Sequence, residues 1–172
     1  DNFAQAMSAI NSAKESSTSY GSAPDLHIFN GTDLRCKKAI FGLYNCCKDS
    51  GILLGNLVNC SADEKTLYAQ QQNKSCHYVG TYCSKKSLFG TCLEKKMTYC
   101  CFGSVLARIV EDAGHTQLGK SWGDAKNPVC GGFSIAEFQQ LDLTAVDFSE
   151  FYADKMGTLA SGNPSSTVAA IT

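Results

Sequence analysis

The sequence predicts a disulfide-rich α+β protein in which short antiparallel β-hairpins, one of them duplicated, are covered by a few short helices. Three observations support this fold class. Ten cysteines lie between residues 36 and 130 of a 172-residue chain. A pattern of paired lysines, Phe-Gly and a cysteine doublet occurs twice. Several of the intervening segments open with residues that cap helices.

The first 24 residues are predicted to form an amphipathic helix and a polar linker. Phe3, Met7 and Ile10 recur at the spacing of one helical face, and the segment from Ser16 to Pro24 is rich in residues that favour loops. This apolar face can either pack on the chain's own domain or bind a partner. The three residues are therefore candidates for partner binding.

A first hairpin is predicted at Asn30-Gly31, which separates two short apolar runs. This dipeptide favours a type I′ turn because both of its residues tolerate positive φ angles. The strands on either side of the turn would then pair with each other.

The next hairpins are predicted from an internal repeat. "CKKAIFGLYNCC" at residues 36–47 aligns with "SKKSLFGTCLEKKMTYCC" at residues 84–101. In each copy a strand enters a turn near Phe-Gly, where glycine accepts positive φ, and a second strand returns to the cysteine doublet. Two copies indicate a duplicated hairpin, since a solenoid needs about three repeats or more.

The helices are predicted from capping residues and apolar periodicity. Ser61 and Glu64 form a capping box before a helix, and residues 76–84 alternate as a half-exposed strand. Ser104 caps a helix whose apolar stripe stops at Gly114 and which should bury against the hairpins. An irregular loop held by Cys130 follows, and then come a helix capped by Ser134 and a final helix at 149–160. The predicted organisation is residues 1–24, a cysteine-rich domain at 25–160, and a flexible tail at 161–172.

The cysteines indicate disulfides formed outside the cytosol, because they are even in number and no C-x-x-C pair or ligand-like histidine spacing supports zinc. Neighbours in sequence rarely bond to each other, so each doublet should bond two different partners. We predict five disulfides, no metal and no cofactor, and the pairing stays open. The ten residues are Cys36, Cys46, Cys47, Cys60, Cys76, Cys83, Cys92, Cys100, Cys101 and Cys130.

Charge is unevenly distributed in the chain. The formal net charge of -1 argues against a nucleic-acid-binding protein. Residues 36–101 carry nine lysines against four acidic residues, whereas the last third is acidic, which suits internal or intermolecular docking. The pairs Lys85-Lys86 and Lys95-Lys96 can bind an acidic partner, or they can protect strand edges from aggregation. They are candidates for partner binding, as is Trp122, the one tryptophan.

Catalysis finds little support in the sequence. Glu111, Asp112 and His115 could perform acid–base chemistry, but no nucleophile or known catalytic motif accompanies them. Ordinary solvation at a helix C-terminus explains the three residues better. No run of 18 apolar residues is present, so no membrane-spanning helix is predicted.

The segment from residue 85 to residue 152 resembles the cysteine-rich C-terminal region of the TraN family, the mating-pair stabilisation proteins of F-type conjugation systems. The upstream "SCHYVGTYCSKK" is also similar to that family. The matching elements are Cys92 to Phe102, Ser104, Leu106 to Ile109, Gln117 to Gly119, Trp122-Gly123, Pro128 to Gly131, Gln140 to Asp142 and Asp147 to Glu150.

The resemblance implies a secreted, disulfide-bonded protein at the periplasm, outer membrane or cell surface of a Gram-negative donor cell. Family members are part of a type IV secretion apparatus and hold donor and recipient together. They are several times longer than this chain, and their receptor-reading tip lies outside the base region that the resemblance covers. The resemblance therefore implies a base with little or no tip, either as a fragment of a longer protein or as a short relative.

We therefore predict a non-enzymatic, outer-membrane-associated protein that supports cell contact in conjugation. Its partners would be outer-membrane or secretion-apparatus proteins, with self-association as a further option and no nucleic acid. Two alternatives remain: a structural subunit of an extracellular filament or secretion-channel assembly, and a secreted hydrolase that uses Glu111 or Asp112 with His115.

Overall fold

A computed structural model gives the structure of the chain and describes residues 8, 27–40, 42, 44–48 and 60–161. Phe3, Met7, Ile10 and nearly all of the predicted N-terminal helix, linker and tail lie outside the described residues. The predicted division into residues 1–24, 25–160 and 161–172 therefore stays a prediction.

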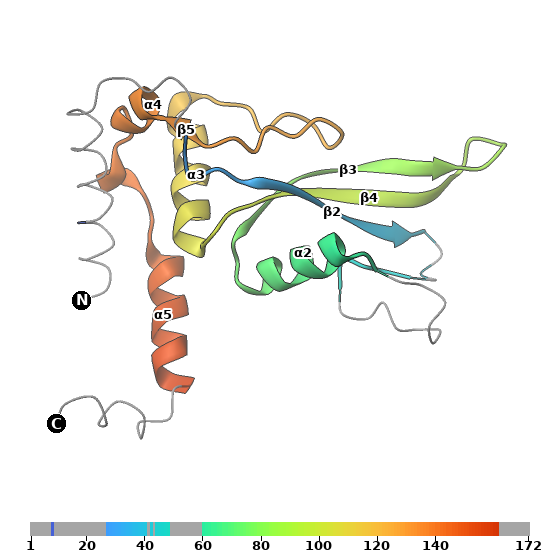
Figure 1. Ribbon diagram of the computed structural model, residues 1–172, viewed down its shortest axis with the longest axis horizontal. Coiled ribbons are helices and arrows are strands. Elements are labelled where there is room, and N and C mark those ends of the chain that lie inside the picture. Colours follow the sequence, from blue (N-terminus) through green and yellow to red (C-terminus); the bar gives the residue numbers. More distant parts are fainter. Residues whose placement is uncertain (1–7, 9–26, 41, 43, 49–59, 162–172) are drawn as a thin grey trace.

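A three-stranded antiparallel sheet is the largest β structure of the described chain (Figure 1). Its strands are β2 (Thr32–Ala39), β4 (Cys92–Cys101) and β3 (Cys76–Lys86), in the order β2-β4-β3. Helix α2 (Ala62–Gln72) packs on one face, where Leu67, Leu34 and Cys36 form a buried cluster with Cys101. The sheet extends beyond this helix toward the β3–β4 turn.

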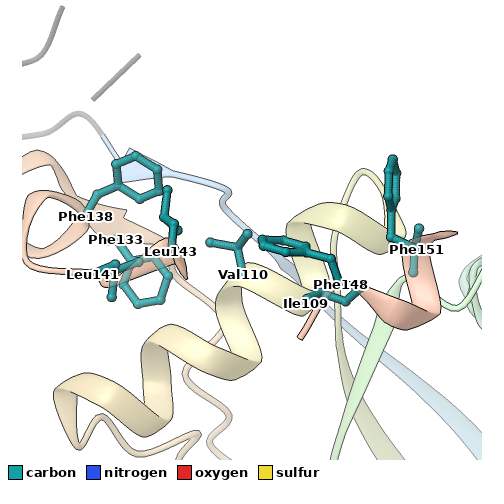
Figure 2. Packing of buried hydrophobic residues seen from close by; sticks show 9 residues of the cluster. Ile109, Val110, Phe133, Phe138, Leu141, Leu143, Phe148 and Phe151 are labelled. Carbon is teal, nitrogen blue, oxygen red and sulfur yellow. The ribbon is translucent and has the colours of Figure 1, made fainter. Parts of the chain in front are cut away.

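The second half of the chain forms its own core at the other end of the sheet. It contains α3 (Val105–Leu118), β5 (Phe133–Ser134), α4 (Ile135–Gln139), the 3₁₀ turn η1 (Leu143–Ala145) and α5 (Ser149–Ser161). Strand β1 (His27–Ile28) joins this half by pairing with β5. Figure 2 shows the core, in which side chains of α3 meet Phe133, Phe138 and Phe148.

The predicted fold class is confirmed. Capping boxes are present at Ser61 and Ser134, and Ser104 caps α3. Both copies of the repeat form turns in which the glycine after phenylalanine, Gly42 and Gly90, has positive φ. In the first copy the return segment makes a single β-bridge, Lys38 to Asn45, in place of a full strand.

The turn predicted at Asn30-Gly31 is wrong. Strand β1 pairs with β5, more than 100 residues away, and β2 pairs with β4. Gly31 is required for close approach, because a Cβ there would lie 2.6 Å from the ring of Phe102. Its N–H donates to the carbonyl of Cys130. Positive φ occurs instead at Phe29, at 59°.

The predicted end of α3 at Gly114 is also wrong. The helix continues to Leu118, and Gly119 caps it in the left-handed conformation. Gly114 lies where the helix contacts Phe133 and leaves room for its ring. The apolar stripe of α3 packs mainly on this C-terminal core, and α2 is the helix that covers the sheet.

Gly114→Ala is expected to destabilise the protein by about 2 kcal/mol, because the new Cβ would lie 2.3 Å from Phe133 in a filled core. Gly157→Ala is the matched control. It also replaces a helical glycine, but no described atom lies within 4 Å of the new Cβ. This variant should therefore raise the free energy of unfolding by about 0.5 to 1 kcal/mol. Thermal unfolding of both variants measures the difference, and equal effects would contradict the packing role of Gly114.

Candidate partner-binding hairpin

Strands β3 and β4 form a long hairpin that projects from the body of the molecule (Figure 1). Cys76–Cys101 joins the strands at the base, and Cys83–Cys92 joins them near the turn. The other disulfides are Cys36–Cys47, Cys46–Cys60 and Cys100–Cys130, and no cysteine is free. Each doublet bonds two different partners, as predicted.

The turn of this hairpin exposes two large apolar side chains completely. The relative exposures of Leu88 and Phe89 are 102% and 95%. The backbone beneath them is ordered by hydrogen bonds: the N–H of Ser87 donates to the carbonyl of Thr91, and the N–H of Gly90 donates to that of Ser87. The hydroxyl of Ser87 also accepts from the N–H groups of Phe89 and Thr91. The two apolar side chains are therefore presented by a fixed turn.

Lysines lie on and beside the two strands of the hairpin, residues 76–86 and 92–101, which we call its shaft. Lys38 lies directly opposite Lys95, and Lys37 lies opposite Lys96, so like charges face one another across β2 and β4. This arrangement is unfavourable unless solvent or an anionic partner screens it. Lys38, Lys86, Lys95 and Lys96 form no ion pair with the described residues, whereas Lys37 pairs with Glu64.

One buried carboxylate supports the distal part of the shaft. Glu94 accepts hydrogen bonds from Tyr44 and Ser84 and pairs with Lys85 at 3.4 Å. Burial alone would raise the pKa of Glu94, but the bonds from Tyr44, Ser84 and Lys85 outweigh it and hold the pKa below its ordinary value. The hairpin near its turn therefore presents positive charge and apolar surface.

The structure brings the four predicted lysines Lys85, Lys86, Lys95 and Lys96 together on this hairpin. Sequence reasoning missed Leu88 and Phe89, although the signal was present: two large apolar residues stand at a predicted turn, where they cannot be buried by their own strands. Trp122 lies elsewhere, in the loop that follows α3.

Trp122 is half-buried between two histidines. Its ring stacks on His77 at 3.9 Å and on His115 at 3.6 Å between centroids, with nearly parallel planes. Two rings this close to one indole occupy its opposite faces. Phe102 also contacts its edge. Both faces of the tryptophan are thus used internally, and its role in partner binding stays a prediction.

Two of the candidate acid–base residues, Glu111 and His115, are not solvated at a helix end, so that interpretation is wrong for them. Because α3 continues past them, Glu111 and His115 face inward and are 0% and 2% exposed. Their nearest atoms, Oε2 and Nε2, are 3.5 Å apart, and no described atom forms a hydrogen bond with either carboxylate oxygen of Glu111. Burial raises the pKa of Glu111, and His115 and Lys120 oppose the shift.

Asp112 is held in a different environment. Its carboxylate forms hydrogen bonds with His77 and Arg108, and Arg108 also pairs with Glu150 of α5. Burial alone would raise the pKa of Asp112, but the bonds from His77 and Arg108 outweigh it and lower the pKa. These ion pairs connect β3, α3 and α5.

The described residues contain one group with metal-ligand proximity, Cys46, Cys60 and Glu64. The two sulfurs are bonded to each other, so neither can act as a thiolate ligand. The group is therefore a disulfide beside the capping carboxylate of α2.

A five-disulfide α+β module belongs to the class of small disulfide-stabilised domains, which are typical of oxidising compartments. More specifically, the chain belongs to the TraN family of F-type type IV secretion systems. The family model, described as F-type Type IV secretion system, TraN, matches residues 1–134. The resembling elements at 140–142 and 147–150 fall outside that range.

One relative is the "Mating pair stabilization protein TraN" of Escherichia coli (strain K12). It is 47% identical over 134 residues, which are 77% of this chain and 22% of the relative. The chain therefore spans about a fifth of the curated relative's length. No solved structure matches.

Within the part of the chain that the structure describes, no helix is long and apolar enough to cross a membrane.

Glu111→Gln is expected to stabilise the protein, and the gain should grow from pH 5 to pH 8. Because the pKa of Glu111 is raised in the folded state, the protonated side chain lowers the stability of the protein only slightly. Stability is then lost as the pH rises through the folded pKa and the side chain ionises. The neutral amide avoids this loss, by on the order of 1 kcal/mol at pH 8. Urea unfolding across this pH range measures the effect.

Asp112→Asn is the contrasting control, because the pKa of Asp112 is lowered in the folded state. Its native contribution is present above the unfolded pKa and disappears as pH falls. The variant should lose on the order of 1 kcal/mol at pH 7 and less in acid. The side chain is about a third exposed, so solvent screening keeps the loss modest. If the change in unfolding free energy had the same pH dependence in both variants, the opposite pKa shifts of Glu111 and Asp112 would be contradicted.

Cys83→Ser combined with Cys92→Ser should loosen the hairpin turn while the rest of the fold persists. Cys83–Cys92 closes a shorter loop than Cys100–Cys130, with sequence separations of 9 and 30. The chain-entropy estimate is about 3 kcal/mol for the first and roughly 1 kcal/mol more for the second. Hydrogen exchange should accelerate at residues 87–91 in the first variant and in α3 in a Cys100→Ser, Cys130→Ser variant. Faster exchange in α3 of both variants would refute local anchoring.

Proposed function

We propose that the chain is a non-enzymatic module of the assembly that stabilises contact between donor and recipient cells in conjugation. It acts outside the cytoplasm, peripheral to the outer membrane, by protein–protein binding. The family membership and the printed name of the E. coli relative support this role. The observation that carries it physically is the projecting, doubly cross-linked hairpin, whose Lys86, Lys95 and Lys96 form no ion pair with the described residues.

Binding is favoured over catalysis by the state of the acid–base residues. Glu111 and His115 are buried, and Trp122 stacks on the ring of His115, so a substrate has no direct access to them. Asp112 is committed to ion pairs with Arg108 and His77. A hydrolase would need at least one such group free in an accessible cleft.

The shaft lysines of the hairpin are the proposed contact for an acidic protein surface. Lys95 lies opposite Lys38, and the repulsion within this pair is relieved when a carboxylate-bearing partner binds. Lys96 lies opposite Lys37, which already pairs with Glu64, and adds a further positive charge. Phe3, Met7 and Ile10 are proposed as a second, apolar contact within residues 1–24. The cysteine-rich domain at 25–160 supports both contacts.

Lys95→Glu combined with Lys96→Glu, made in donor cells in the protein's native context, should lower DNA transfer in liquid culture by roughly tenfold or more. Reversing the charges turns attraction for an acidic partner into repulsion. Transfer on a solid surface should fall much less, because there the cells are held together without a stabiliser. Lys65→Glu with Lys126→Glu is the control, with exposed lysines outside the hairpin.

Equal losses in liquid and on the solid surface would contradict contact stabilisation and favour a structural subunit of the secretion channel. Unchanged transfer in both conditions would contradict the role of the hairpin lysines. Protein levels and disulfide content are compared in all variants, so that a folding defect is recognised.

A further inference from the structure

We propose that the distal end of the β3–β4 hairpin inserts Leu88 and Phe89 into the surface of an anionic phospholipid bilayer. The proposal adds a lipid contact to the protein contact on the shaft, and it rests on the proposed function only for its setting beside a membrane. The two contacts use different residues and can therefore be tested separately.

The exposed apolar surface of the described residues is concentrated at this end. Eight large hydrophobic side chains are exposed, and four of them are Ile40, Leu88, Phe89 and Leu93. Ile40 and Leu93 lie on adjoining strand ends, because the N–H of Ile40 donates to the carbonyl of Leu93. Such clustering at a projecting end is typical of a contact surface.

Charge next to the apolar end matches an anionic surface. Residues 84–93 contain Lys85 and Lys86 and no acidic residue. The next acidic residue in sequence, Glu94, is buried and already bonded to Lys85, Tyr44 and Ser84. Lys86 is exposed and forms no ion pair with the described residues. Apolar side chains at the turn can contact the acyl chains of lipids while the neighbouring lysines contact the phosphate groups.

Most backbone donors of the turn are satisfied within it. The N–H groups of residues 87, 89, 90 and 91 are hydrogen-bonded within the turn, and that of Leu88 has no hydrogen-bond partner among the described residues. The N–H group of Leu88 therefore bonds to water or to lipid headgroups at the bilayer interface. Cys83–Cys92 holds the strands together directly behind the turn, so the tip enters as a fixed shape.

A lipid partner explains this geometry better than a protein pocket does. A stable protein interface buries on the order of 800 Å² on each side, which the apex of a two-stranded hairpin does not offer. A bilayer needs no complementary pocket, because apolar side chains that pass the headgroups are covered on all sides. The small apex is therefore an advantage on a membrane and a disadvantage on a protein.

Co-sedimentation of the oxidised full chain with vesicles tests the proposal. Vesicles of equal parts phosphatidylglycerol and phosphatidylcholine should bind the chain, and vesicles of phosphatidylcholine alone should bind it much less. Leu88→Ser combined with Phe89→Ser should lower binding to the anionic vesicles by roughly tenfold or more, since most of the buried apolar area is lost. Lys86→Ala should lower it about fivefold on anionic vesicles alone.

The matched controls are Met156→Ser, which removes an exposed apolar side chain on α5, and Lys65→Ala, which removes an exposed lysine on α2. Neither should change binding. A Phe89→Trp variant should shift its fluorescence to shorter wavelength on anionic vesicles only. Because Leu88 and Phe89 are fully exposed, all tip variants should unfold at the temperature of the parent chain.

Absence of binding to anionic vesicles, or equal binding by the double serine variant, would overturn the proposal. If vesicles are not bound but the tip variants reduce transfer in liquid culture, the tip contacts a protein, and the proposed function stands without the lipid contact. Binding to vesicles together with unchanged transfer in the Lys95 and Lys96 variants supports the lipid contact and contradicts the protein contact proposed for the hairpin lysines.

Discussion

Adjacent residues of a β-strand point to opposite faces of the sheet, and this constraint gives the doublet Cys100-Cys101 its structural role. Cys101 lies in the cluster beneath α2 and bonds Cys76 on the neighbouring strand. Cys100 lies in a separate cluster with Phe102 and bonds Cys130 in the loop after α3. One dipeptide thereby connects two hydrophobic cores that share no other covalent cross-link among the described residues. The two disulfides of this doublet therefore fix the three-stranded sheet to the segment that follows α3.

The loop tied down by Cys130 completes the junction through ring stacking and ion pairs. Trp122 lies between His77 of β3 and His115 of α3, so it joins the sheet to the helix directly. Arg108 of α3 pairs with Asp112 and with Glu150 of α5, and Lys120 pairs with Glu137 of α4. The acidic last third of the chain thus docks on basic residues of its own half, while Lys86, Lys95 and Lys96 of the hairpin form no ion pair with the described residues.

Local signals predicted the local structure well. Ser61, Ser104 and Ser134 fixed the starts of three helices because capping depends on residues only three positions apart. The doublet geometry predicted that Cys100 and Cys101 bond different partners, but the choice of partner depends on how the chain folds back. Asn30-Gly31 and Gly114 were misinterpreted for the same reason: glycine serves close packing there, against Phe102 and Phe133, and sequence alone does not separate packing from turning. The error at Gly114 is also why the burial of Glu111 and His115 was not predicted, because a helix that ended at Gly114 would have left them at its solvated terminus.

The candidate site depends on what the rest of the fold leaves uncovered. Helix α2 packs over the strands near Leu34 and Cys36, and the loop around Ala125 packs on Thr98 and Gly80, so the half of the sheet nearest the junction is covered on both faces. The distal half extends past both elements, and there the disulfide Cys83–Cys92 replaces the hydrophobic contacts that normally stabilise a hairpin. A hairpin held by a disulfide can expose Leu88 and Phe89 without loss of order. Covalent cross-linking therefore allows this hairpin to be stable while it exposes apolar and charged side chains, which is difficult for a small domain held by a hydrophobic core alone.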